Sequence, residues 1–245
     1  MHRSSEYESA IVRVGELSHD TVRVMATLYL DNYDGSSEAL FREDLVDKDE
    51  AVLLYHDRAL VGFTTLKLYE VVWRGVLVHI VYSGDTIVSP QHWGQQELAF
   101  AWINRIGQLK RTAPSVPLYW FLLVKGHRTF KYLSVFGKSF YPHWQFDRGD
   151  LKPLADQLAT AKFGSTYNPV TGVVEFEESH GHLKERIACP TREEMIKPAT
   201  QFFLRSNPGY RQGHELVCIC ELELFNMKPL TARVFRRALE ESVYA

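Results

Sequence analysis

The sequence lacks several features that would place it in a specialised class of protein. It has three cysteines in 245 residues, too few for a disulfide framework. No charge of one sign dominates, because 28 Lys and Arg stand against 30 Asp and Glu, so no nucleic-acid partner is expected. The longest apolar run, 117–124, is too short for a membrane span, and residues 1–10 form no signal peptide. These absences predict a soluble, cytoplasmic globular protein without a membrane partner.

The motifs of several enzyme classes are also missing. We find no G-x-G-x-x-G, no Walker loop, no G-x-S-x-G elbow and no H-E-x-x-H. Residues that could bind a metal are present, but their spacing matches no closed zinc pattern: His180, His182, Cys189, Cys218 and Cys220. Dinucleotide-dependent oxidoreductases, P-loop enzymes and α/β-hydrolases are therefore disfavoured, and no metal cofactor is expected.

The hydrophobic pattern of residues 10–145 predicts a mixture of strands and helices. The expected elements are a strand over 10–14, helices over 17–29 and 38–46, strands over 51–55, 60–69 and 76–88, a helix over 95–109, a strand over 118–124 and a helix over 128–136. A short polar turn, His56-Asp57-Arg58, predicts an antiparallel hairpin. A meander followed by one crossover helix predicts an α/β fold with a mixed sheet. Gly137 is expected to end the last helix in a left-handed conformation.

Residues 146–245 are predicted to form an α+β extension that packs on the first part. The expected elements are a helix over 154–161, short strands around a turn at 168–172, a helix from 191 to 204 that ends at 207–209, a strand over 216–224 and a helix over 227–243. The helix from 191 begins with a T-x-x-E capping box, Thr191 and Glu194. We find no flexible linker, so we expect one continuous body, divided into residues 1–145 and 146–245.

One segment between a long strand and a helix resembles a known family. The sequence VSPQHWGQQ at 88–96 is similar to V-x-P-x-x-R-G-x-G-x-G, which joins the fourth strand and third helix of the GCN5-related N-acetyltransferase (GNAT) superfamily. The strand pair over 51–66, with Gly62, resembles that family's second and third strands. The resemblance covers about residues 10–145. It implies a GNAT-like acyltransferase domain with a mostly antiparallel central sheet flanked by helices.

The pyrophosphate-binding loop of this family is altered in the present sequence. Val88, Pro90 and Gly94 match the motif, whereas Trp93 stands where Arg or Gln is usual. Gln96 and Leu98 replace later small residues, so the loop is degenerate. Free backbone N–H groups at such a helix start bind the pyrophosphate of coenzyme A. The resemblance therefore implies binding of acyl-CoA or acetyl-CoA by a loop that includes Val88, Trp93, Gly94, Gln95 and Gln96.

A second group of candidate ligands for the donor follows the apolar strand at 118–124. Lys125, His127, Arg128 and Lys131 should lie beyond the carboxyl end of that strand, where open α/β sheets bind ligands. Such cations suit a phosphate, a carboxylate or an acyl carrier protein, and Lys125 and Arg128 are the candidates for the cofactor. A solvated basic helix surface is the alternative interpretation.

The resemblance also suggests catalytic residues. Acyl transfer to an amine needs a base for the ammonium and an acid for the leaving thiolate. By position in the family's pattern, Asp85 is the candidate base and Tyr132 the candidate acid. The alternatives are that Asp85 accepts hydrogen bonds from nearby backbone groups, and that Tyr132 is a packed aromatic residue.

The sequence thus predicts a GNAT-like N-acyltransferase that moves an acyl group from acyl-CoA, or another thioester, to an amine of a small molecule. An acyl carrier protein is a further candidate partner, and a homodimer is compatible with the sequence. The alternative is a GNAT-fold protein without acetyltransferase activity, which binds a ligand, serves in assembly or uses the cleft for another reaction.

Overall fold

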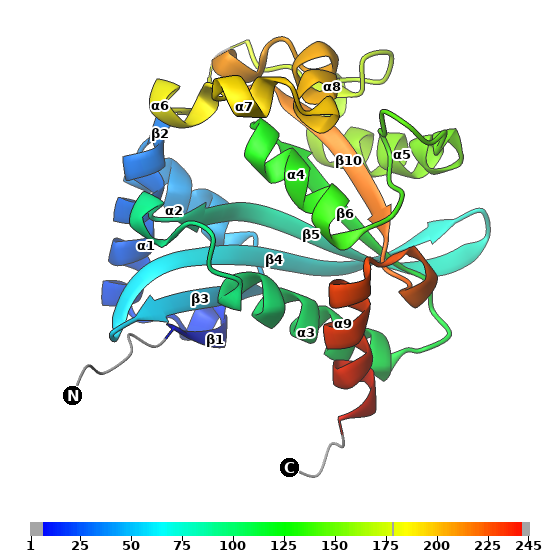
Figure 1. Ribbon diagram of the computed structural model, residues 1–245, viewed down its shortest axis with the longest axis horizontal. Coiled ribbons are helices and arrows are strands. Elements are labelled where there is room, and N and C mark those ends of the chain that lie inside the picture. The colour runs from blue at the N-terminus through cyan, green and yellow to red at the C-terminus, as the bar shows by residue number, and fades with distance from the viewer. Residues whose placement is uncertain (1–6, 178, 242–245) are drawn as a thin grey trace.

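One sheet of eight strands organises the molecule (Figure 1). The computed structural model describes residues 7–177 and 179–241. The strand order is β1-β3-β4-β5-β6-β10-β8-β7. The strands are β1 (Tyr7–Arg13), β3 (Glu50–His56), β4 (Ala59–Trp73), β5 (Val76–Val88), β6 (Leu118–Val124), β7 (Tyr167–Asn168), β8 (Val173–Val174) and β10 (Glu215–Glu221). Among the strands of the described residues, only β5 and β6 pair in parallel.

Helices cover both faces of this sheet (Figure 1). They are α1 (His19–Asn32), α2 (Glu38–Val46), α3 (Glu97–Thr112), α4 (His127–Phe136), α5 (Lys152–Phe163), α6 (Glu185–Ala188), α7 (Arg192–Met195), α8 (Pro198–Ser206) and α9 (Pro229–Glu240). Two further short strands, β2 (Tyr33–Asp34) and β9 (His182–Leu183), pair with each other. The mixed, mostly antiparallel sheet with flanking helices that the sequence predicted is confirmed.

Alternation along the strands separates the core into layers. In β6, Trp120 and Leu122 join the cluster that contains α3, α4 and α9, whereas Tyr119 and Phe121 face α5. In β3, Leu53 packs in a third cluster with α1 and α2. The central strand is therefore buried on both faces, as its continuous apolar sequence predicted.

Local sequence signals explain where several elements begin. Ser18 and Ser37 accept hydrogen bonds from backbone N–H groups in the first turns of α1 and α2. The predicted hairpin between β3 and β4 is also confirmed. Its two turn residues, Asp57 and Arg58, both have positive φ, 48° and 68°, which suits the right-handed twist of the strands.

Two details differ from the prediction. Gly137 ends α4 with φ −104°, in an extended conformation, because it continues into an antiparallel bridge with Met227. The helix expected from 191 to 204 is two helices, α7 and α8. Pro198 occupies the first turn of α8, where its missing N–H does no harm, and it cannot continue the hydrogen bonds of α7. The capping box at Thr191 is present. Val243, in the last predicted helix, lies outside the described residues.

The parallel strands β5 and β6 separate partway along their length. Their pairing runs from His79 opposite Leu118 to Ser83 opposite Leu122. Beyond this point β5 stays with β4 as far as Val88, and β6 stays with β10. The β4–β5 register places one extra residue in β5 between Ser83 and Thr86, and such a bulge bends a strand. An opening therefore forms between β5 and β6.

Residues 146–245 contribute to the same sheet. β10 pairs with β6 from Leu216 opposite Val124 to Glu221 opposite Tyr119, and β8 and β7 follow it. The sheet thus continues across residue 145, and the division of the chain there stays a prediction. Within residues 7–177 and 179–241, no helix has both the length and the apolar character needed to cross a bilayer.

Candidate active site

Three connected cavities lie around the opening between β5 and β6. The loop pocket, of about 410 Å³, borders the segment between β5 and α3. The aromatic pocket, of about 420 Å³, borders α1 and α2. A small notch of about 70 Å³ lies between them. Thr86 and Thr129 line all three cavities, so the two larger pockets adjoin the same side chains at the opening.

Unpartnered backbone donors lie at the start of α3, and two of their residues, Gly94 and Gln95, line the loop pocket. The N–H groups of Gly94, Gln95, Gln96 and Glu97 donate to no acceptor among the described residues. Gln96 caps α3 without a side-chain hydrogen bond, so the first turn keeps these donors. Gly94 has φ +91°, which favours glycine, and nothing lies within 4 Å of the place a Cβ would take. This arrangement can bind an anion despite the altered loop sequence.

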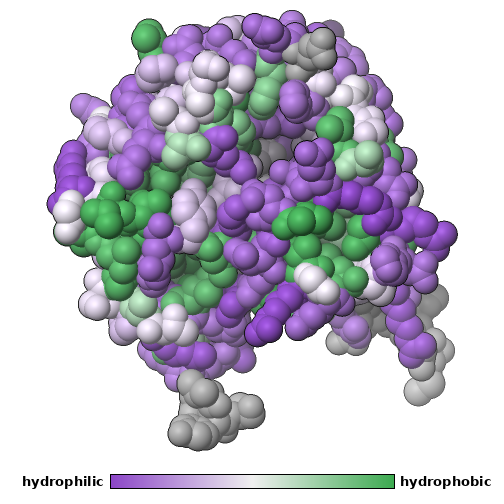
Figure 2. Space-filling model, turned by 180° about the vertical axis from the view of Figure 1, so that it is seen from behind, coloured by the Kyte–Doolittle hydropathy of each residue, from purple (hydrophilic) through white to green (hydrophobic). Residues whose placement is uncertain are grey.

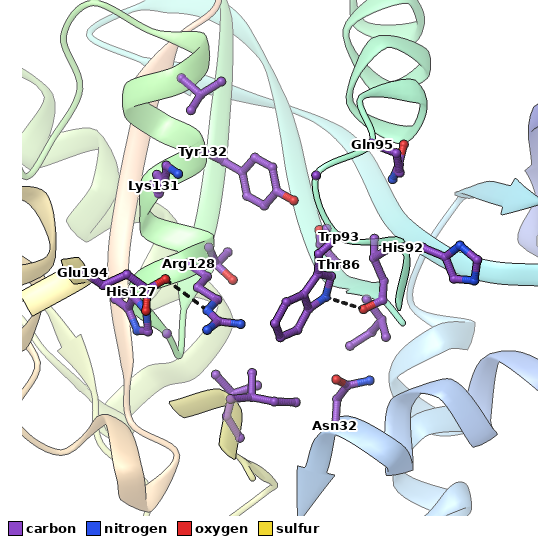
Figure 3. Close-up of a pocket in the computed structure, with 18 of the residues that line it drawn as sticks. Asn32, Thr86, His92, Trp93, Gln95, His127, Arg128, Lys131, Tyr132 and Glu194 are labelled. Carbon is purple, nitrogen blue, oxygen red and sulfur yellow. Dashed lines mark hydrogen bonds and ion pairs between the residues drawn. The ribbon is translucent and has the colours of Figure 1, made fainter. Parts of the chain in front are cut away.

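Trp93 and Arg128 face each other across the loop pocket (Figure 3). The indole Nε1 of Trp93 donates to the carbonyl oxygen of Val88 at 2.8 Å, which holds the ring beside the loop. The guanidinium carbon of Arg128 lies 4.3 Å from the centre of that ring, a cation–π contact. Glu194 lies 3.5 Å from Nε of Arg128. The pocket is therefore walled by the loop, by α4 and by a residue of α7.

The four cations predicted after β6 separate into two groups. His127, Arg128 and Lys131 line the loop pocket. His127 is 4% exposed, and its burial lowers its pKa. Lys125 instead lines the aromatic pocket, where its Nζ lies 3.1 Å from Glu215. Lys125 thus lies apart from the other three cations, in the aromatic pocket.

Aromatic side chains form the floor of the notch. The indole of Trp120 donates to Oγ of Ser83 at 2.8 Å, directly where β5 and β6 stop pairing. The ring centres of Trp102 and Trp120 lie 4.7 Å apart, and Phe136 packs against both. Tyr132 lines the notch and the loop pocket, and its hydroxyl points into the latter in Figure 3. Burial raises the pKa of Tyr132, which keeps its hydroxyl protonated at neutral pH.

Asp85 lies on the other side of the opening, in the aromatic pocket. Its carboxylate forms no hydrogen bond or ion pair with a described residue. Burial raises its pKa to about 7, and the nearby charge of Asp44 adds to this rise, whereas Lys125 and Lys48 oppose it. A carboxylate with a pKa near neutrality can both bind an ammonium group and accept its proton.

The structure brings most of the predicted site residues to one opening. Val88, Trp93, Gly94, Gln95, Arg128 and Tyr132 line the loop pocket. Gln96 is the capping residue of α3 next to it. Asp85 and Lys125 line the aromatic pocket. The predicted acid and base therefore face the opening from opposite sides, which is compatible with two substrates that meet there.

Sequence reasoning missed Thr86, Thr129 and most of the aromatic pocket. Tyr29 and Tyr33 stack with ring centres 4.5 Å apart at the end of α1. Their spacing of four residues was no signal for this stack, because Tyr33 follows the end of α1 and lies in β2. Glu215 comes from β10, and no local pattern links it to Lys125. Among the residues that the structure describes, no group of three metal-ligating side chains occurs.

Comparisons with known proteins give similarity in structure alone. No protein-family model matches the sequence, and no curated protein matches it. The chain is similar to a probable N-acyltransferase from Enterococcus faecalis, with TM-score 0.41 and 11% identity over 54% of this chain. That alignment spans 33% of the Enterococcus protein. It is also similar to the GNAT family N-acetyltransferase YhbS from Escherichia coli, solved in complex with CoA, with TM-score 0.38 and 15% identity over 56% of this chain and 72% of that one.

A third similar structure is Arabidopsis thaliana NAA60 in complex with a bisubstrate analogue. Its TM-score is 0.38, with 15% identity over 57% of this chain and 89% of that one. At such scores and identities, these similarities carry no conclusion about activity. In this chain the loop after β5, the crossover helix α3 and the parallel strand β6 follow in the order that the resemblance implied.

The raised pKa of Asp85 makes the stability of the protein depend on pH. In the unfolded chain an aspartate titrates near pH 3.9, about three units below Asp85 in the folded protein. Below about pH 4 the group is protonated in both states, and its burial as a neutral acid costs little. As pH rises from about 4 to about 7, the unfolded chain releases this proton while the folded protein still holds it. The folded state therefore loses stability relative to the unfolded chain over this range.

We therefore predict that Asp85→Asn raises the free energy of unfolding by roughly 1–3 kcal/mol near pH 8, and by much less near pH 4. Urea denaturation at the two pH values measures the difference. Asp31→Asn, at an exposed position of α1, is the control and should have little effect at either pH. An equal gain for Asp85→Asn at both values would show that its carboxylate is not held with a raised pKa.

Proposed function

We propose that the protein is an N-acyltransferase that uses an acyl-CoA donor and a small-molecule amine acceptor. The observation that carries this proposal is the meeting of two different pockets at the opening between β5 and β6. The loop pocket has unpartnered backbone donors and Arg128, and the aromatic pocket has Asp85. An enzyme that joins an anionic donor to a cationic acceptor needs such a pair of sites.

The residues of the loop pocket fit coenzyme A. The N–H groups of residues 94–97 would hold the pyrophosphate, supported by the positive end of the α3 dipole. Arg128 and Lys131, on the opposite wall, would contact phosphate oxygens. Trp93 leaves the N–H groups free, because its ring is turned toward Val88 and Arg128. The side chains that altered the motif therefore do not remove the anion site.

The chemistry requires three proton movements around one bond exchange, because two protons leave the acceptor nitrogen and one reaches the departing sulfur. The bound acyl-CoA supplies an activated acyl group, whose C–S bond breaks as the bond between the acyl carbon and the amine nitrogen forms. Asp85 would bind the ammonium form of the acceptor and take one proton from its nitrogen. The hydroxyl of Tyr132 would give its proton to the departing sulfur, and the second proton that the nitrogen loses as the amide forms would restore the Tyr132 hydroxyl. The raised pKa of each residue suits its role, since Asp85 can exchange a proton near neutrality and Tyr132 stays protonated.

A GNAT-fold protein without acyl transfer is the second candidate function. The specific observation in its favour is the altered loop, in which Gln96 and Leu98 stand at positions of small residues. In that case the loop pocket would bind another anion or a partner protein, such as an acyl carrier protein. Coenzyme A binding separates the two candidates.

We predict that coenzyme A binds the wild-type protein in a calorimetric titration, and that Arg128→Ala weakens the affinity about tenfold, because a charged hydrogen-bond partner of the phosphates is lost. Arg42→Ala, on the exposed face of α2 where Arg42 pairs with Glu38, is the matched control and should leave the affinity unchanged. No binding at millimolar concentration would rule out the coenzyme A donor.

We also predict that Tyr132→Phe lowers turnover about a hundredfold while the affinity for coenzyme A changes little, because only the proton of the hydroxyl is removed. Turnover is measured as thiol release from acetyl-CoA in the presence of a panel of primary amines. Tyr55→Phe, on β3 and away from the three cavities, serves as the control. An unchanged rate for Tyr132→Phe would remove this residue from the mechanism.

A further inference from the structure

Aromatic rings form much of the wall of the aromatic pocket. They are Tyr29, Tyr33, Phe41, Tyr82, Phe163 and Phe176. Two lysines of the protein already lie over these rings. Lys125 Nζ is 5.4 Å from the centre of Tyr33, and Lys162 Nζ is 4.9 Å from the centre of Tyr82. The faces of the rings thus attract cations within this pocket.

Most carboxylates of the aromatic pocket are neutralised by lysines. Asp44 lies 2.7 Å from Lys48, and Glu215 lies 3.1 Å from Lys125. Asp47 pairs with Lys67 and with Lys162. Because a lysine pairs with each of these three carboxylates, they offer a ligand little net negative charge.

Two carboxylates that line the pocket have no such partner among the described residues. One is Asp85, at the opening between β5 and β6, and the other is Glu43, which is exposed on α2. They come from different elements, β5 and α2. A ligand in this pocket can therefore contact an unpaired carboxyl group on each of these two elements.

Tyr82 adds a hydrogen-bonding group to the wall of the pocket. Its side chain is 6% exposed and lines the pocket, and its hydroxyl forms no hydrogen bond with a described residue. The hydroxyl is therefore available to water or to a ligand. Figure 2 views the molecule from behind, and that surface is mostly hydrophilic, with its hydrophobic residues in separate patches. The aromatic pocket itself, of about 420 Å³, suits a small molecule.

We infer that the acceptor is a small organic diamine or polyamine, whose reacting nitrogen contacts Asp85 while a second ammonium group is held near Glu43. The aromatic faces between the two carboxylates accommodate the carbon chain and the cations. This inference rests on the proposed function, because it assigns the acceptor of the same site. It adds that the protein selects its acceptor by a second positive charge.

The test compares two amines that differ in that charge. Putrescine and n-butylamine have the same carbon chain, and each is titrated calorimetrically into the protein saturated with coenzyme A. We expect putrescine to bind at least about ten times more tightly than n-butylamine. Glu43→Gln should remove most of this preference. Glu38→Gln, on the same helix but outside the pocket, is the control and should preserve it.

Equal affinity for the two amines, absence of putrescine binding at millimolar concentration, or the same loss in Glu43→Gln and Glu38→Gln would overturn the inference. Thiol release from acetyl-CoA is measured in parallel and tests the proposed function separately. Selective putrescine binding without thiol release would overturn acyl transfer and leave the diamine site standing. Thiol release with singly charged amines and no preference for putrescine would overturn the diamine site and leave acyl transfer standing.

Discussion

The separation of β5 from β6 after Ser83 and Leu122 is the constraint on which the site depends. Up to that pair the two strands share hydrogen bonds. The indole of Trp120 donates to Oγ of Ser83 at this last paired position. Beyond it, an extra residue bends β5 away. All three cavities lie around the resulting opening, and Thr86 and Thr129 line each of them. Without the separation, a continuous sheet would keep the two pockets apart.

The last hundred residues supply a partner strand for β6 where it separates from β5. A strand that leaves its neighbour exposes backbone N–H and C=O groups, which are costly when buried. β10 pairs with β6 along its length, so β6 keeps its partners on that edge as it leaves β5. The same segment supplies Glu215 and Lys162 to the aromatic pocket and Glu194 to the loop pocket. The extension is therefore a structural part of both cavities.

The sequence predicted the parts of the fold that depend on local chemistry. Ser37 and Thr191 marked helix starts, and the run at 118–124 marked the central strand, because caps and apolar runs act within a few residues. The ion pair between Lys125 and Glu215 was out of reach, since it joins residues that only the sheet brings together. The raised pKa of Asp85 likewise depends on burial and on Asp44, neither of which has a local signature. Pro198 was a missed signal, because its ring should have divided the predicted helix.

A crystal structure of the protein with bound coenzyme A would show whether the opening between β5 and β6 receives the acyl donor, because it locates the sulfur atom relative to that opening. We predict pyrophosphate density at the N–H groups of residues 94–97 and the sulfur between β5 and β6, beyond Ser83 and Leu122 and within reach of Tyr132. Density for coenzyme A elsewhere, or a sulfur that points away from the opening, would contradict it.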